Sequence, residues 1–576
     1  MKRRSPWTRM LLPFLIAAGV QGKPAFQFMF ANADTVALYE KWETQFDVSA
    51  DFVNPFDPDE ISMLATITGP SGREWKIPGF FGSGFMPWTV RFSPNETGRW
   101  TCRIHATDRK GSALSAPDTF FVIPSKRRGP VRISSANRRY MEYADGTPFY
   151  GVGLWYNGGF FTYPKGPSQT QELDRLKDMG VNFISAFLIP LETIGTGVGR
   201  YDQQLCARLD QLLEWCEERD FVLSLNLWFH SFLSETVWPG FNRRWNTNPY
   251  KNVCRAKDFF SSTKAWTYQE KLYRYIIARW AYSRALGIWF IVDEVNGTDG
   301  WASGDSLGAA KWGKKVHEYF KANDPYGHPT TGTRSGGVGE FWHEGYQTFD
   351  LAAREIYEAQ GFPILTDGKI DPGDTHPLRL SYMNYAGEIR RLWRGYSKPV
   401  IIGETGWDHT FYEPSMPGYL ALYHNALWTG LSAGMAMTPF WWSYSDYIND
   451  NVVTHQLANM AAFASQIPFS KLTGLAPVEV SVTNGDAFVM KSDQLTFGWV
   501  VNPESDVSGA AVKVLSLPDG DYTLRLYHTW GGRFFHQETC SCKNGIVAFS
   551  IPVLKIVDSR AQYVGQDVAF ILKPSD

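Results

Sequence analysis

Between residues 139 and 469, short apolar runs alternate with amphipathic stretches of helical periodicity, and this repeat constrains the fold more than any other feature. Residues 205–219 and 263–282 are two such helical stretches. The apolar runs that we interpret as strands are 150–156, 181–189, 222–230, 288–294, 329–334, 351–357, 400–404 and 435–442. Strands that alternate with helices predict a parallel sheet with helical crossovers, and eight such units predict its closure into a (β/α)8 TIM barrel.

The sequence on each side of this repeat has a different pattern, typical of short antiparallel strands. Alternating runs such as 42–48 and 88–92 are separated by Pro and Gly before the repeat, and runs such as 495–501 and 522–527 follow it. We therefore expect a multidomain α/β protein, with the following parts: an N-terminal β-sandwich over 23–125, a linker over 126–138, the barrel over 139–469 and a C-terminal β-sandwich over 470–576.

The first residues have the pattern of an export signal. Lys2, Arg3 and Arg4 precede an apolar run over 10–20, which is followed by Gly22. A basic start and a short apolar run are typical of a secretory signal peptide, here over residues 1–22. The sequence thus predicts a secreted or periplasmic protein. No other stretch has the length that a transmembrane helix requires, so we expect no stable membrane insertion.

Charge and cysteine content exclude several classes of function. A formal net charge of −2 gives no electrostatic basis for binding nucleic acid. The six cysteines lack the spacing of metal ligands, and we expect neither a metal nor an organic cofactor. Aromatic residues make up 15% of the chain and include 23 Trp, which suits stacking on sugar rings, although a single Trp is more often a core residue. For Trp499 and Trp530 we favour the core.

Two glutamates, Glu294 and Glu404, each end an apolar run that we interpret as a barrel strand. Catalytic residues of such barrels lie at the C-terminal ends of the strands. Hydrolysis of a glycosidic bond uses a pair of carboxyl groups, one as acid and the other as nucleophile or base. The pair therefore indicates a glycosidase. The alternative, two structural glutamates held in ion pairs, also perturbs carboxylates and stays open.

Several segments resemble a known enzyme family. Residues 274–283 and 288–294, the turn at 324–329, residues 398–406 and the Trp441–Trp442 pair resemble the (β/α)8 retaining glycoside hydrolases of clan A, the cellulase-like superfamily. The stretch before the repeat resembles the small β-domain that often precedes such barrels. The resemblance implies that Glu294 is the general acid/base and Glu404 the nucleophile. Burial and the charge of Glu404 are both expected to raise the pKa of Glu294.

Asp293 departs from the family pattern, which has Asn immediately before the acid/base to bind the 2-hydroxyl of the substrate. An ionised Asp only accepts hydrogen bonds, whereas Asn also donates them. Asp293 still offers an acceptor to that hydroxyl, and its charge is expected to raise the pKa of Glu294 further. The change favours an altered substrate or pH optimum, and it leaves open a barrel without turnover.

Further residues at the presumed catalytic rim are candidates for binding substrate. Because side chains alternate along a strand, Asn226, Trp228 and His230 are expected on one side of theirs, and only one of Trp441 and Trp442 faces the site. The resemblance implies that Tyr357 hydrogen-bonds the nucleophile and that His230 contacts substrate. With Asp293, the full set of candidates is Trp155, Asn226, Trp228, His230, Arg334, Tyr357, Trp407, Trp441 and Trp442.

These features together predict a secreted retaining glycoside hydrolase that cleaves O-glycosidic bonds of a plant, algal or microbial glycan by double displacement. Its partner is then an oligosaccharide or polysaccharide substrate. Two alternatives stay open. One is a catalytically weak or inactive barrel that binds carbohydrate, for which Asp293 is the motive. The other is a transglycosylase, in which an acceptor sugar replaces water in the second step.

Overall fold

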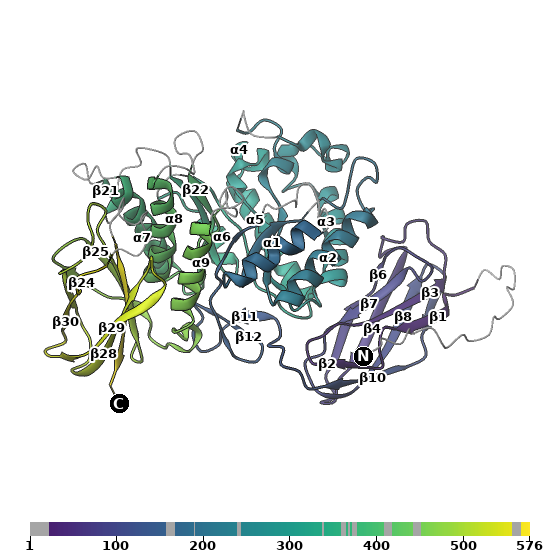
Figure 1. Cartoon of the computed structure of the whole chain (residues 1–576). Helices are drawn as coiled ribbons and strands as arrows, with labels where there is room; N and C mark the ends of the chain where they lie inside the picture. The colour runs from purple at the N-terminus through teal and green to yellow at the C-terminus, as the bar shows by residue number, and fades with distance from the viewer. Residues whose placement is uncertain are drawn as a thin grey trace.

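The structure is a computed structural model in which strands and helices alternate through the centre of the chain, with an all-β region at each end (Figure 1). The predicted signal peptide lies, except for Gly22, outside the described residues. No helix among the described residues is long and apolar enough to cross a membrane. The described residues are 22–156, 167–188, 190–238, 243–336, 339–358, 365–366, 369–370, 377–407, 417–441, 451–555 and 566–575.

The N-terminal region consists of two antiparallel-rich sheets that share one core. One sheet has the order β1-β3-β7-β6, and the other has the order β2-β10-β8-β4-β5 with β9 paired to β8. Along β3, buried and less buried residues alternate, and Trp42 from this strand stacks on Phe120 of the other sheet with ring centroids 4.3 Å apart. The strands are β1 (Ala25–Ala31), β2 (Thr35–Ala37), β3 (Trp42–Ser49), β4 (Ile61–Thr68), β5 (Glu74–Pro78), β6 (Phe80–Phe81), β7 (Trp88–Phe92), β8 (Gly98–Asp108), β9 (Gly111–Leu114) and β10 (Asp118–Ile123).

An ion-pair network attaches this region to the central helices. Arg91 of β7 donates to Asp210 Oδ1 over 2.7 Å and to Glu43 Oε2 over 2.7 Å. Asp210 also accepts from Arg279 and from the Trp280 indole, each over 2.7 Å. Burial alone raises the pKa of Asp210, but the charges of Arg91 and Arg279 outweigh it and lower that pKa. The N-terminal region is therefore anchored through a partly buried carboxylate that pairs with two guanidinium groups.

The stretch predicted as a linker, residues 126–138, contains a strand. Here β11 (Val131–Ile133) forms a small antiparallel sheet with β12 (Met141–Tyr143) and β13 (Pro148–Phe149). This sheet directly precedes the first parallel strand of the central region.

The central strands run parallel in two sheets that backbone hydrogen bonds connect. One sheet follows the chain order β14 (Gly153–Trp155), β15 (Phe183–Phe187), β16 (Val222–Trp228), β17 (Leu286–Val292) and β18 (Thr330–Thr331), and the other pairs β19 (Ala352–Glu358) with β22 (Val400–Trp407). Leu351 N donates to Thr330 O over 3.2 Å, which joins the two sheets. Across residues 435–441, Ala436 N donates to Val400 O and Thr438 N donates to Gly151 O, which connects the last strand back to the first.

Seven of the eight predicted apolar runs contain a strand, and several strands are shorter than predicted. In the eighth run, Met437 and Trp441 form only isolated bridges. Pro439 lies between them and has no N–H group, so it cannot take part in a continuous ladder as a donor.

Helices connect these strands, and Figure 1 shows α1, α2 and α3 together in the central region. The predicted helix at 205–219 is part of α2, which begins after Asp202, whose side chain accepts from the N–H groups of Gln204 and Leu205. The helices are α1 (Pro167–Asp178), α2 (Gln203–Arg219), α3 (Thr263–Trp280), α4 (Asp299–Ala302), α5 (Ser306–Asn323), α6 (His343–Thr348), α7 (Pro377–Gly395), α8 (Pro417–Ala433) and α9 (Asn451–Ala464). A short hairpin pairs β20 (Leu365–Thr366) with β21 (Lys369–Ile370).

The C-terminal region again contains two antiparallel sheets, with the orders β23-β25-β26-β31-β28-β29 and β24-β27-β30. Its strands are β23 (Ala476–Pro477), β24 (Val480–Val482), β25 (Asp486–Lys491), β26 (Thr496–Val501), β27 (Ala511–Val514), β28 (Gly520–His528), β29 (Arg533–Cys542), β30 (Val547–Ser550) and β31 (Val568–Pro574).

Asp567 connects this region to α8. Its carboxylate accepts from the indoles of Trp499 over 2.5 Å and Trp530 over 2.9 Å, and His424 Nε2 of α8 lies 2.9 Å from it. The Trp530 ring also stacks on His424 at 4.2 Å. Both tryptophans are buried, so the interpretation of Trp499 and Trp530 as core residues is confirmed.

We expect the Asp567→Asn substitution to lower the unfolding free energy by about 2–4 kcal/mol, because it removes the charge from a buried, hydrogen-bonded pair. The unfolding temperature measured by calorimetry checks this, with Asp493→Asn at an exposed position as the control. Equal temperatures for the two variants would show that the network adds no net stability.

Candidate active site

Four carboxyl side chains from three central strands converge in one buried cluster. Asp293 and Glu294 directly follow β17, Glu355 lies in β19 and Glu404 lies in β22, and all four are buried. Glu355 and Glu404 are register partners across the β19–β22 pair. One oxygen from each of Asp293, Glu355 and Glu404 lies within 4.8 Å of the others, and His230, Asp293 and Glu294 form a second group of the same size. The two predicted catalytic glutamates therefore belong to one cluster, which shares Asp293.

His230 is the cation of this cluster. Its Nδ1 lies 2.9 Å from Glu294 Oε2 and 3.9 Å from Asp293 Oδ2. Burial alone lowers the pKa of His230, but the negative charges of Glu294 and Asp293 outweigh it and raise the pKa to about 10. The imidazole is therefore protonated at neutral pH. Because the folded pKa is raised, the stability from this pair is complete below the unfolded value of 6.5 and is lost as pH rises through about 10.

Glu294 has a lowered pKa, and the prediction of a raised one is wrong. Burial raises it, as expected, but the charge of His230 and hydrogen bonds with His230, Ser335 and Glu355 outweigh burial. The prediction considered the neighbouring carboxylates and omitted the cation. For Asp293 burial dominates, with Glu294 adding to it, and the pKa is raised.

The backbone of Glu294 is left-handed, with φ 43° and ψ 52°. For a residue other than Gly this conformation costs on the order of 1 kcal/mol or more, and such residues cluster at functional sites. Thr333 holds the residue there: the Glu294 N–H donates to Thr333 Oγ1 over 3.0 Å, and the Val295 N–H donates to Thr333 O over 3.1 Å. The turn directs the Glu294 carboxyl toward His230.

Glu355 is the residue that the sequence analysis missed. Its Oε1 accepts a hydrogen bond from Thr333 Oγ1. Burial first, and then the charges of Glu404, Glu294 and Asp293, raise its pKa well above the usual range. A signal was present, because Arg354 and Glu355 are consecutive charged residues in the buried stretch 351–356, where charges need partners. Arg354 pairs with Glu388 of α7, which leaves the opposite face of the strand to Glu355.

Three predicted residues lie close to the carboxyls or to the strand that carries Glu404, Trp441 through an isolated bridge to Thr405. Asn226 is buried and interacts with Asp293, whose pKa it lowers. The Trp155 indole donates to Gly403 O over 2.7 Å, next to Glu404, and stacks on Phe187 at 4.4 Å. Trp441 is buried, with its ring edge to face with that of Tyr423 at 5.0 Å.

Arg334 pairs with Glu340, with Nη2 and Oε2 2.7 Å apart, and its guanidinium lies 5.9 Å from the Trp301 ring. Tyr357 and Trp407 occupy strand positions in β19 and β22, where only their backbone is described. Trp442 lies outside the described residues.

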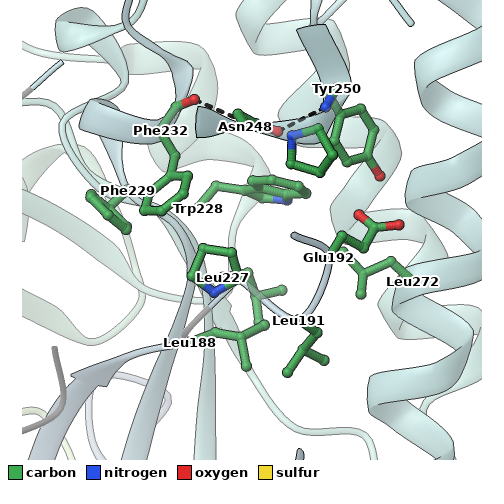
Figure 2. Close-up of a pocket in the computed structure, with 12 residues that line it drawn as sticks. Leu188, Leu191, Glu192, Leu227, Trp228, Phe229, Phe232, Asn248, Tyr250 and Leu272 are labelled. Carbon is green, nitrogen blue, oxygen red and sulfur yellow. Dashed lines mark hydrogen bonds between the residues drawn. The ribbon is translucent and has the colours of Figure 1, made fainter. Parts of the chain in front are cut away.

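Trp228 lies in a separate pocket (Figure 2), and the prediction that it faces the site with Asn226 and His230 is wrong. Its indole donates to Tyr273 OH of α3 over 2.9 Å. The prediction assumed that side chains alternate along one strand from Asn226 to His230. The strand β16 ends at Trp228, and a 3₁₀ turn begins at His230, so this alternation does not reach His230. The cavity measures about 20 Å³, room for about one water. Its lining includes Leu188, Leu191, Glu192, Leu227, Tyr250 and Leu272.

Glu192 in this pocket makes folding stability depend on pH. Burial raises its pKa to about 8, against hydrogen bonds from Gly199 and Tyr250 that lower it. Between the unfolded value of 4.5 and about 8 the folded state holds the proton more tightly, so stability falls as pH rises across this window, by at most about 1.4 kcal/mol per pH unit. We expect Glu192→Gln to remove this dependence in calorimetric scans over the window. The exposed Glu218→Gln variant is the control, and a slope equal to that of the wild type in Glu192→Gln would contradict the assignment.

Comparisons with known proteins find solved structures of similar fold. A family model described as a domain of unknown function (DUF5060) matches residues 35–107, within the N-terminal sheets. A putative glycoside hydrolase from Bacteroides vulgatus ATCC 8482 superposes with a TM-score of 0.63 at 15% identity, over 94% of this chain and 100% of that one. A second glycoside hydrolase superposes with a TM-score of 0.50 at 15% identity, over 78% and 97%. A comparison with curated protein sequences gives no match. At these identities the likeness is one of fold.

Proposed function

We propose that this protein is a retaining glycoside hydrolase that cleaves O-glycosidic bonds of a plant, algal or microbial glycan after export from the cell. One observation carries the proposal: Glu294, which follows β17, and Glu404, within β22, belong to two buried carboxyl groups that share Asp293. Double displacement requires two such carboxyls on facing sides of the scissile bond. The likeness of the fold to glycoside hydrolases supports it.

We infer that residues 139–469 form a (β/α)8 barrel between β-sandwiches over 23–125 and 470–576. The parallel pairing of β14 to β18, and the hydrogen bonds that lead from β18 through β19, β22 and residues 435–441 back to Gly151, support the barrel. The paired antiparallel sheets at each end support the sandwiches.

In the first step of the proposed reaction, a Glu404 oxygen attacks the anomeric carbon and the bond to the leaving oxygen breaks. That oxygen takes the proton of His230, which passes through the Glu294 carboxyl 2.9 Å away, so His230 ends the step neutral and Glu294 ends it ionised, as it began. The protonated imidazole thus supplies the proton that Glu294, because of its lowered pKa, does not hold. The product of this step is a glycosyl ester of Glu404.

In the second step, a water molecule attacks the same carbon as its proton passes to Glu294 and His230, and the ester bond to Glu404 breaks. Both catalytic groups return to their initial charge. Asp293 and Asn226 lie beside Glu294 and are proposed to contact the sugar hydroxyl next to the anomeric carbon.

A second candidate is a carbohydrate-binding protein without turnover. The ionised state of Glu294 favours it, because an acid that has lost its proton protonates no leaving group unless His230 supplies one. A third, transglycosylation, differs from hydrolysis only in the acceptor of the second step.

The test is hydrolysis of a panel of aryl glycosides and polysaccharides by the mature protein, with the first-formed product anomers followed by NMR. Retained configuration is expected. Inverted configuration would overturn the double displacement, and sugar binding without hydrolysis of any substrate would favour the binding protein. Products that lengthen at high acceptor concentration would identify transglycosylation.

A further inference from the structure

Glu355 is the most deeply buried carboxyl of the cluster, with 0% of its surface exposed. It projects from the middle of β19, directly across from Glu404 in β22. Its Oε1 accepts from Thr333 Oγ1, which in turn accepts from the Glu294 N–H. Its Oε2 is also buried and receives no N–H or O–H donor from the described residues. The carboxyls next to Glu355 are Glu294, with which it is hydrogen-bonded, and Glu404, its register partner.

The charge around Glu355 is already strongly negative. Asp293, Glu294 and Glu404 surround it, and among the described residues the ion pairs to these carboxyls come from His230. A further buried negative charge without a partner is costly, and a carboxyl in this position keeps its proton instead. The direction of the Glu355 pKa, well above the usual range, agrees with this argument from burial and neighbours.

We propose that Glu355 stays a neutral carboxylic acid and donates a hydrogen bond from its buried oxygen to the carboxylate of Glu404. Glu355 is then a positioning residue: it orients the nucleophile and stabilises its charge without adding a second one. A carboxylate accepts but does not donate, so a hydrogen bond between Glu355 and Glu404 requires a proton on one of them, and we assign it to the more deeply buried Glu355. The inference rests on the proposed role of Glu404, and it deepens that function by naming a residue that prepares the nucleophile.

The same contact is useful after the first step. Once one Glu404 oxygen is bonded to the sugar, its other oxygen is a neutral carbonyl that still accepts the Glu355 proton. The ester is held in place while water attacks, and the proton of Glu355 is not consumed. Glutamine at position 355 has the same shape and also places a donor at this point.

The first experiment detects the proton without any substrate. We use infrared spectra of protein that carries carbon-13 in its glutamate carboxyls, at neutral pH. The Glu355→Gln variant is expected to lose one band of a protonated carboxylic acid that the wild type shows. Glu192→Gln is the matched control, because it removes another buried protonated glutamate, in a separate pocket, and should remove a different band. A wild-type protein whose acid bands are all retained in Glu355→Gln would overturn the proposal, as would a divalent cation that copurifies and neutralises an ionised Glu355.

The second experiment measures turnover of the best glycoside substrate. Glu355→Gln is expected to keep kcat within about tenfold of the wild type, whereas Glu355→Ala, without a donor, loses on the order of a hundredfold. Losses of equal size in both variants would overturn the proposal. If the wild type hydrolyses no substrate, the proposed function fails, and the infrared experiment still decides whether Glu355 holds a proton.

Discussion

Replacing Glu404 with Gln is expected to lower kcat by roughly a thousandfold or more on every substrate that the wild type hydrolyses. An amide is a poor nucleophile, so the glycosyl ester does not form. Because Gln keeps the size of the side chain, binding of the sugar should persist. Turnover and the dissociation constant, measured on the same preparation, check both expectations.

Glu192→Gln is the matched control for this variant, since it makes the same chemical change at a buried glutamate outside the carboxyl cluster. It should retain the wild-type rate. Near-wild-type turnover of Glu404→Gln would show that Glu404 is not the nucleophile, and Glu355 would then be the next candidate for that role.

Replacing Glu294 with Ala is expected to have the second-largest effect, and one that depends on the leaving group. For a natural sugar leaving group, kcat/KM should fall by about 10²–10⁴-fold, because the oxygen must depart without a proton. For an aryl glycoside with a very acidic phenol, the first step needs no acid, so kcat/KM should be largely kept while the second step becomes slow.

Added azide distinguishes the roles of the two glutamates. As a nucleophile that needs no general base, it should restore turnover of Glu294→Ala on the activated substrate and appear as a glycosyl azide of retained configuration. The Glu404 variant should give no such product. Equal losses for activated and natural leaving groups would show that Glu294 is not the acid/base.

The parts of the site that the sequence predicted are those fixed by position along a strand. Glu294 and Glu404 stand at the ends of apolar runs, and parallel strands bring such ends together, so their clustering follows from topology. Asn226 beside Asp293 and His230 beside Glu294 follow in the same way.

The remaining features depend on contacts between segments distant in sequence. The pKa of Glu294 reverses direction because of His230, which lies far from it along the chain. Trp228 turns toward Tyr273 because its strand ends there and helix α3 offers a partner. The sequence alone does not distinguish Glu355 from the other glutamates, because its position opposite Glu404 depends on the register of β19 and β22. A pattern of apolar residues specifies strands, but it does not specify which charges meet.

The salt bridges of Arg91 hold the N-terminal region in place against the central helices, which matters for a long substrate. Asp210 pairs with Arg91 of the N-terminal sheet and with Arg279 of helix α3, so the two regions share one partly buried carboxylate. Removing the N-terminal region takes away Arg91 and Glu43 together and leaves Asp210 with Arg279 and Trp280 as its partners, so the remaining chain loses part of this network. If the proposed glycan substrate contacts both regions, this network fixes the distance between the two contact points.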